Sequence, residues 1–126
     1  EQLVSLGVPA LLGLPVPEGD ISQYGVIETT EDGIFKSIVE KPAPGEEPSR
    51  MINVTKYVLP GSVMPFIEAA MQGRPNASGE YYISDPIAEL VESGQAIQLV
   101  EAQGTFLDTG TVETWVKANQ WLLDAS

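Results

Sequence analysis

The sequence contains no cysteine and no histidine among its 126 residues. The absence of cysteine excludes disulfides and thiolate chemistry within the chain. The absence of histidine excludes a serine–histidine nucleophile, imidazole zinc ligands and imidazole acid–base catalysis. Any chemistry in this chain therefore depends on carboxylates, amines, hydroxyls and backbone groups.

Basic residues are scarce: six stand against 18 acids, for a net charge of −12. This balance argues against a nucleic-acid or anionic-membrane partner, because both require clustered lysine and arginine. Three of the bases, Lys41, Arg50 and Lys56, fall within one short region. We expect an anion to be met there, while the acids suit a divalent cation or simply keep the protein soluble.

Long hydrophobic runs are also lacking, as is a basic-then-apolar signal at the N-terminus. We therefore expect a cytoplasmic protein without a membrane partner. The apolar fraction of 43% and the length fit one domain with a real core. The chain begins at Glu1 inside a helical pattern, which leads us to expect a fragment of a longer protein.

The hydrophobic periodicity predicts a mixture of strands and helices, which indicates an α/β fold with a mixed sheet. A "TEDG" turn between two strands predicts a hairpin, and Pro15 predicts that the first strand ends before it. The predicted strands are 9–16, 24–29, 34–40, 51–59, 96–102 and 105–108. The predicted helices are 1–7, 62–73, 86–93 and 111–125.

Capping residues mark the helix starts. Ser62 is a candidate N-cap, as is Ser84 or Asp85 ahead of Pro86. Thr111 is expected to cap the last helix without a capping box, because the residue three positions on is neither an acid nor glutamine. Six residues of that helix loosely trace a core face: Val112, Trp115, Val116, Asn119, Leu122 and Leu123.

An acid–base pair, Glu40 and Lys41, ends the second hairpin strand directly before Pro42. Proline disfavours helix at the residue before it, so the pair is expected to be extended. A carboxylate can accept hydrogen bonds from sugar hydroxyls, and an ammonium can neutralise a phosphate. Spacing alone favours the simpler interpretation, a solvated strand end.

Other candidate residues carry weaker signals. Tyr24-Gly25 opens a strand where backbone can approach a ligand, although a turn glycine explains it equally well. Alternation places Asn53, Thr55 and Tyr57 on one strand face, which could line a pocket but more commonly faces water. In the "GEYYISD" segment, helix capping explains Ser84 and Asp85, but it does not explain Glu80.

Asp108 ends the short predicted strand 105–108 and is followed by a glycine and a helix start. Ligands bind at the carboxyl ends of strands in α/β sheets, and Mg²⁺ is usually held by one or two carboxylates plus substrate phosphates. Asp108 could equally cap the turn into the last helix, and spacing does not separate the two interpretations.

Six segments in order resemble the sugar-1-phosphate nucleotidyltransferases, in particular the bacterial UTP–glucose-1-phosphate uridylyltransferase and glucose-1-phosphate thymidylyltransferase group. The segments are "YGVIE", "IVEKP", "INVTKYVLP", "GEYYISD", "FLDTGT" and "WVKANQWLL". The resemblance covers nearly the whole chain. It implies a Rossmann-like nucleotidyltransferase fold with a mixed sheet flanked by helices, and the formation of NDP-sugar and pyrophosphate from NTP and a sugar 1-phosphate with Mg²⁺.

The resemblance also implies roles for individual residues. Gly25, beside Tyr24, would give a backbone contact to the sugar, and Glu40 would accept from its hydroxyls. Lys41 would bind the sugar phosphate, and Asp108 would be one of two metal-binding aspartates. Asn53 and Tyr57 would lie near the sugar-binding floor. With the resemblance included, ligand binding becomes the favoured interpretation of Glu40, Lys41 and Asp108.

Two departures from the family pattern stand out. The glycine-rich nucleotide loop, its basic residues and the other metal aspartate are absent, so residues 1–126 resemble only the C-terminal, sugar-phosphate-binding half. Thr55 stands where many relatives have glycine, which puts the usual sugar preference in question. UTP with glucose 1-phosphate is the favoured pair, but UTP and dTTP are not separated.

The missing half has a physical consequence. A buried strand at 9–16 would be left exposed, so we expect a homo-oligomer, or a separate chain that supplies the N-terminal half, and no turnover by the monomer. Two alternatives remain: a non-catalytic sugar-phosphate-binding or regulatory module, and an acidic α/β domain without a site.

Overall fold

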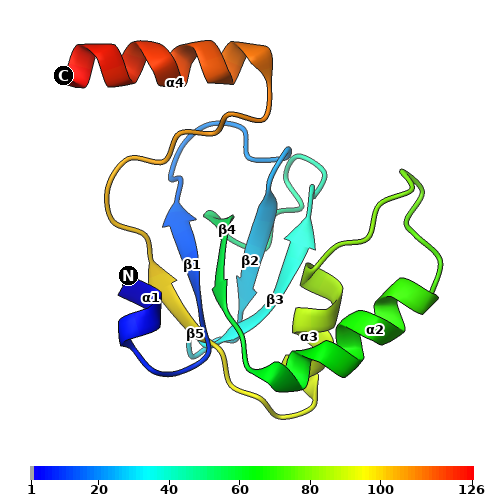
Figure 1. Ribbon diagram of the computed structural model, residues 1–126. Helices are drawn as coiled ribbons and strands as arrows, with labels where there is room; N and C mark the ends of the chain where they lie inside the picture. Colours follow the sequence, from blue (N-terminus) through cyan, green and yellow to red (C-terminus); the bar gives the residue numbers. More distant parts are fainter. Residues whose placement is uncertain (1) are drawn as a thin grey trace.

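The computed structural model describes residues 2–126, so Glu1, at the start of the predicted helix 1–7, lies outside the described residues. Figure 1 shows a central sheet with helices beside it. The helices are α1 (Gln2–Ser5), a short 3₁₀ helix (Gly61–Val63), α2 (Met64–Gln72), α3 (Ser84–Glu92) and α4 (Val112–Ala125). The strands are β1 (Ala10–Pro15), β2 (Gly25–Thr29), β3 (Phe35–Glu40), β4 (Met51–Val58) and β5 (Gln98–Glu101).

The five strands form one mixed sheet in the order β3-β2-β4-β1-β5. β1 and β5 are parallel, whereas β1–β4, β2–β3 and β2–β4 are antiparallel. The predicted α/β class, the mixed sheet and the β2–β3 hairpin are confirmed. The predicted strand 105–108 is wrong, because the structure has no strand there and β5 ends at Glu101.

Pro15 belongs to β1, so the prediction that the strand ends before it was wrong. Proline has no N–H for the ladder, but the next residue continues it: the Val16 N–H donates to the Arg50 carbonyl over 2.8 Å. Pro15 itself pairs with Met51. It is exposed, so its missing N–H leaves no buried hydrogen-bonding group without a partner.

β4 contains an irregularity opposite β1. Leu11 pairs with Tyr57 and Gly13 pairs with Asn53, so two steps along β1 correspond to four along β4. Thr55 lies in the excess segment with φ of 55°, in the left-handed region that β-branched residues rarely adopt. The Asn53 Oδ1 accepts a hydrogen bond from the Thr55 N–H over 3.0 Å and holds this bulge.

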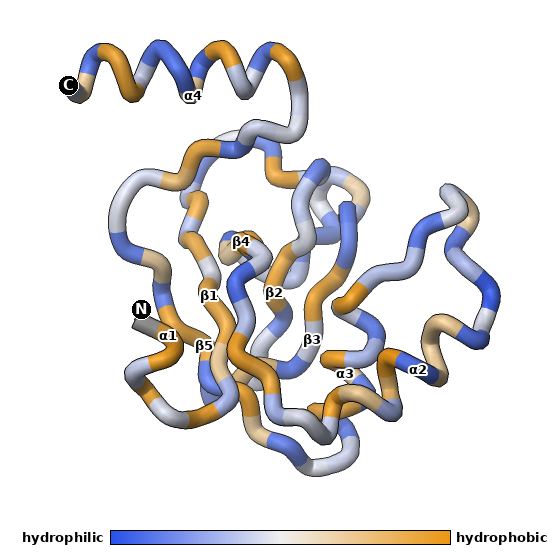
Figure 2. The backbone as a smooth tube through the Cα atoms, viewed as in Figure 1, coloured by the Kyte–Doolittle hydropathy of each residue, from blue (hydrophilic) through white to orange (hydrophobic). Residues whose placement is uncertain are grey.

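Each face of the sheet has its own apolar cluster. On one face, α2 and α3 pack against strand residues that include Leu11, Ile27 and Phe35. On the other face, the buried Ile21, Val26, Ile52 and Val54 are covered by connecting segments rather than by helices. Figure 2 shows hydrophobic residues along the strands and at intervals along α2, α3 and α4.

Neither predicted side-chain cap at α2 or α3 is present. A 3₁₀ turn at Gly61–Val63 leads into α2, and Ser62 is exposed with no cap bond. α3 begins at Ser84, ahead of the predicted Pro86, because the Ile87 N–H already bonds to the Ile83 carbonyl. The Ser84 side chain is therefore buried inside the first turn.

Helix α4 differs from prediction on two points. Thr111 caps it as predicted, but a capping box is present, because the Thr114 hydroxyl accepts from the Thr111 N–H over 3.1 Å. The predicted core face is also exposed, and Ala118 is the one buried residue of the described helix. α4 extends beyond the end of the sheet (Figure 1). Among the described residues, no helix is long and apolar enough to cross a membrane.

Candidate functional site

Gly25 and Glu40 face each other where the hairpin begins and ends. The register pairs Gly25 with Glu40, the first residue of β2 with the last of β3. A Cβ built on Gly25 would lie 2.9 Å from both the Glu40 Oε2 and the Ile38 Cγ2. The Glu40 carboxylate therefore lies against the Gly25 backbone, in space that any side chain at this position would occupy.

Lys41 turns away from the strand that precedes it. Its φ is 46°, so the prediction of an extended pair was wrong at this residue. Pro42 disfavours the right-handed helical region, but the chain takes the left-handed one, and the Lys41 N–H closes the hairpin on the Tyr24 carbonyl over 3.1 Å. Left-handed non-glycine residues store strain and gather at functional sites.

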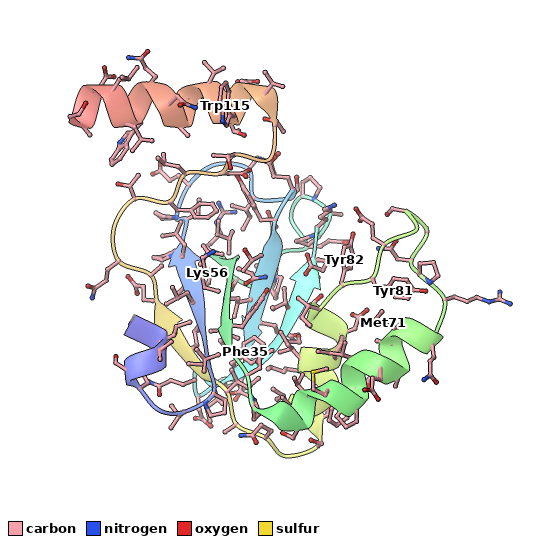
Figure 3. All side chains as sticks on the ribbon, viewed as in Figure 1. Phe35, Lys56, Met71, Tyr81, Tyr82 and Trp115 are labelled. Atoms are coloured by element: carbon pink, nitrogen blue, oxygen red, sulfur yellow. The ribbon has the colours of Figure 1, made fainter. Side chains whose placement is uncertain are left out.

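The turn carries the Lys41 ammonium towards the segment ahead of α3. Its Nζ lies 4.0 Å from the Glu80 Oε2 and 5.9 Å from the centre of the Tyr82 ring. Figure 3 shows Tyr82 beyond β3, on the side of α3. The ion pair is exposed and contributes little to stability, so the ammonium is available to a ligand. Sequence reasoning left Glu80 unexplained and did not identify Tyr82 as its neighbour.

Asn53 and Tyr57 form a hydrogen-bonded pair next to Glu40. The Asn53 Nδ2 donates to the Tyr57 hydroxyl over 2.6 Å, and Asn53 is buried. Burial is the main cause of the raised pKa of the Tyr57 phenol; the Asn53 hydrogen bond opposes it, and the nearby Glu40 charge adds to it. The predicted common face holds for these two residues but not for Thr55, which the left-handed bulge turns away.

We expect Glu40→Gln to lower the pKa of Tyr57, because the substitution removes a negative charge that disfavours the phenolate. Ultraviolet titration of tyrosinate measures the pKa of Tyr57, and the Tyr57→Phe variant assigns the signal. Glu28→Gln, on the same hairpin, is the control. The folded pKa is raised above an unfolded value of about 10. The stability linked to Tyr57 is therefore complete below pH 10 and lost as pH rises through the folded pKa. A Tyr57 pKa equal in both variants would contradict this arrangement.

Tyr24 joins the two parts of the site. Its carbonyl accepts from the Lys41 N–H, and its phenol lies against the Asp108 carboxylate. Burial, followed by the charge and hydrogen bond of Asp108, raises the pKa of Tyr24. The predicted residues Tyr24, Gly25, Glu40 and Lys41 are thus contiguous, and Asp108 adjoins them through the Tyr24 ring.

Asp108 is half-buried and forms a turn as well as facing Tyr24. Its Oδ1 accepts from the Gly110 N–H over 2.9 Å, so the turn-capping interpretation accounts for one oxygen. The carboxylate also accepts a hydrogen bond from the Tyr24 hydroxyl, and it lines a cavity of about 360 Å³. No group of three or more acids gathers among the described residues. One carboxylate fits Mg²⁺ only as part of a set completed by other oxygen ligands.

Arg50 is not available to an anion, although the sequence grouped it with Lys41 and Lys56. Its guanidinium donates to the Val16 carbonyl over 2.9 Å and to the Gly19 carbonyl over 2.6 Å, and it pairs with Glu47. These bonds hold the loop after β1. The two lysines are the cations of this region that remain accessible.

Comparison with known protein families matches the nucleotidyl transferase family over residues 7–125. The chain belongs to this family. The UTP–glucose-1-phosphate uridylyltransferase of Pseudomonas aeruginosa is 31% identical over 110 residues, which cover 84% of this chain and 38% of that protein. A putative UTP–glucose-1-phosphate uridylyltransferase of Methanocaldococcus jannaschii is 35% identical over 108 residues, which cover 82% of this chain and 37% of that protein.

Solved structures share the fold of this chain. A UDP-glucose pyrophosphorylase complexed with UDP-glucose superposes with a TM-score of 0.81 at 23% identity, covering 99% of this chain and 49% of that one. A UTP-bound UGPase from Acinetobacter baumannii superposes with a TM-score of 0.75 at 24% identity. That match covers 96% of this chain and 41% of the other. The region of this chain that matches the two curated relatives spans well under half of their length.

Proposed function

We propose that this chain is the sugar-1-phosphate-binding part of a nucleotidyltransferase that converts UTP and glucose 1-phosphate into UDP-glucose and pyrophosphate. The observation that carries the proposal is the contact between Gly25 and Glu40, which leaves an acceptor carboxylate on bare backbone. The names of the relatives at 31% and 35% identity support the choice of UTP and glucose.

Each site residue then has a distinct task. The sugar lies on the Gly25 backbone, and Glu40 accepts from its hydroxyls. Asn53 holds the Tyr57 hydroxyl by donating to it, which leaves the Tyr57 proton free to donate to a sugar oxygen. Lys41 neutralises the sugar phosphate as a point charge, so that the phosphate oxygen is positioned for in-line attack on the α-phosphorus of the nucleotide.

Asp108 is the residue of this chain that would hold Mg²⁺. The ion would offset negative charge on the phosphates during the reaction. The charge of the Asp108 carboxylate and its position at a cavity fit this task, and the remaining ligands would be phosphate oxygens and a second aspartate. In this proposal, the nucleotide loop and that aspartate lie in the part of the fold that residues 1–126 do not match.

The exposed apolar side of α4 supports a further partner. Trp115 is 56% exposed and Leu123 is 70% exposed, more than a stable single domain needs to leave uncovered. The nucleotide-binding half of the fold, in this polypeptide or another, or a second copy of the chain would cover this surface. We propose accordingly that the chain alone does not turn over substrate.

Lys41→Met tests the proposed function. Calorimetric titration with glucose 1-phosphate should show at least about tenfold weaker binding than the wild type, because a charged hydrogen bond is lost. Lys36→Met is the matched control, since Lys36 pairs with Glu28 over 2.7 Å on the outer part of the same hairpin. Equal affinities in the two variants, or no binding by the wild type, would refute the assignment.

A further inference from the structure

A second accessible cation, Lys56, lies in the cavity that contains Asp108. The cavity measures about 360 Å³ and is lined by β1, β4 and the segment 102–109. Its volume falls within the range of small-ligand sites. Its apolar floor, which includes Leu12 and Val54, belongs to the cluster on the sheet face opposite α2 and α3. Lys41 does not line it, so the cavity is separate from the contacts of the Lys41 side chain.

The bulge in β4 brings successive residues of that strand to the wall of this cavity. Three successive residues, Val54, Thr55 and Lys56, line it, whereas a regular strand directs alternate residues to opposite faces. The segment between Asn53 and Tyr57 stands opposite the single residue Leu12, so it is released from ladder pairing. Bulges redirect side chains next to active sites, and this one is maintained despite a left-handed threonine.

The charge on Lys56 is unused within the protein. Lys36, Lys41, Arg50 and Lys117 each form an ion pair, but Lys56 forms none with the residues that the structure describes. Figure 3 shows Lys56 on β4, at the centre of the sheet. The residues that line the cavity with Lys56 include Thr55, Thr105, Thr109 and Asp108.

We propose that Lys56 binds the polyphosphate group of a nucleoside triphosphate, or the pyrophosphate that leaves it, inside this cavity. A lysine ammonium is a compact phosphate-binding charge, threonine hydroxyls donate to phosphate oxygens, and a carboxylate can share a divalent cation with them. The inference rests on the proposed function and extends it: Lys41 serves the sugar phosphate, and Lys56 serves the polyphosphate.

Calorimetric titration with sodium pyrophosphate, without divalent cations, tests this assignment. Lys56→Met should bind pyrophosphate at least about tenfold more weakly than the wild type, because the charged donor is lost. Lys36→Met should stay within about twofold, since it removes the same charge from a surface away from the cavity. Glucose 1-phosphate should bind to Lys56→Met as it does to the wild type.

The other outcomes separate this inference from the proposed function. Equal pyrophosphate affinities for Lys56→Met and Lys36→Met overturn the role of Lys56, while a Lys41→Met loss for glucose 1-phosphate still supports the proposed function. Weaker binding of glucose 1-phosphate alone by Lys56→Met assigns Lys56 to the sugar phosphate and overturns the proposal. A wild type that binds neither ligand overturns both.

The bulge itself is tested by Thr55→Gly. Glycine adopts a φ of 55° without a Cβ clash, so the melting temperature should rise by roughly 3 °C. Thr29→Gly, at the end of β2 and outside the positive-φ region, should lower it, because glycine there relieves no strain and loses more backbone entropy on folding. A lower melting temperature for Thr55→Gly would contradict the strained bulge on which the placement of Lys56 depends.

Discussion

Gly25→Ala is expected to weaken glucose 1-phosphate binding by at least about thirtyfold, roughly 2 kcal/mol. The added Cβ would lie 2.9 Å from the Glu40 Oε2, so the carboxylate has to move from the position that we assign to sugar binding. The methyl group also covers the backbone on which the sugar is proposed to lie. Calorimetric titration of the variant measures the loss.

Gly61→Ala is the matched control for this effect. A Cβ at Gly61 meets no atom within 4 Å, and its φ lies outside the left-handed region. The same substitution should therefore leave both binding and stability nearly unchanged there. Gly25→Ala should lower the stability by about 1–3 kcal/mol, as overpacking does. If Gly25→Ala binds glucose 1-phosphate as well as Gly61→Ala does, Glu40 and Gly25 do not form the sugar site.

Asp108→Asn is expected to abolish the Mg²⁺ dependence of pyrophosphate binding. In the wild type, Mg²⁺ should strengthen binding by about tenfold or more, because the ion links the carboxylate to phosphate oxygens. Without Mg²⁺ the variant should bind slightly better than the wild type, since a like charge near the anion is removed. Calorimetric titrations with and without Mg²⁺ measure both effects.

Two readouts support the interpretation of that variant. The pKa of Tyr24 should fall in Asp108→Asn, because one cause of its elevation is the Asp108 charge. Asp32→Asn, in the exposed turn of the hairpin, removes the same charge at a distance and should keep the Mg²⁺ effect. A tenfold Mg²⁺ effect that persists in Asp108→Asn would exclude Asp108 as a ligand of the ion.

The sequence predicts this fold best where the pattern is local. The "TEDG" turn between two strand-like segments predicts that β2 pairs with β3, and the observed register puts Gly25 opposite Glu40. The segment 105–108 has two adjacent apolar residues between polar ones, and no strand forms there. Whether so short a segment joins a sheet depends on distant parts of the chain, which local patterns do not specify.

The features that position Lys41 and Lys56 were beyond the sequence for a different reason. Lysine and threonine rarely take left-handed conformations, so no propensity predicts φ of 46° at Lys41 or 55° at Thr55. Both depend on tertiary hydrogen bonds, from Lys41 to Tyr24 and from Thr55 to Asn53. The amphipathic pattern of α4 indicated a face that needs a partner, but amphipathicity does not tell which surface supplies it.

The most direct test of the central claim is a two-dimensional amide NMR titration of the ¹⁵N-labelled chain with glucose 1-phosphate. The account predicts that the amides of Gly25, Glu40, Lys41 and Tyr57 shift together and saturate with one dissociation constant, while the amide of Gly94, beyond α3, stays in place. Shifts confined to other residues, or no saturable shift at these four, would contradict the assignment of this site to a sugar phosphate.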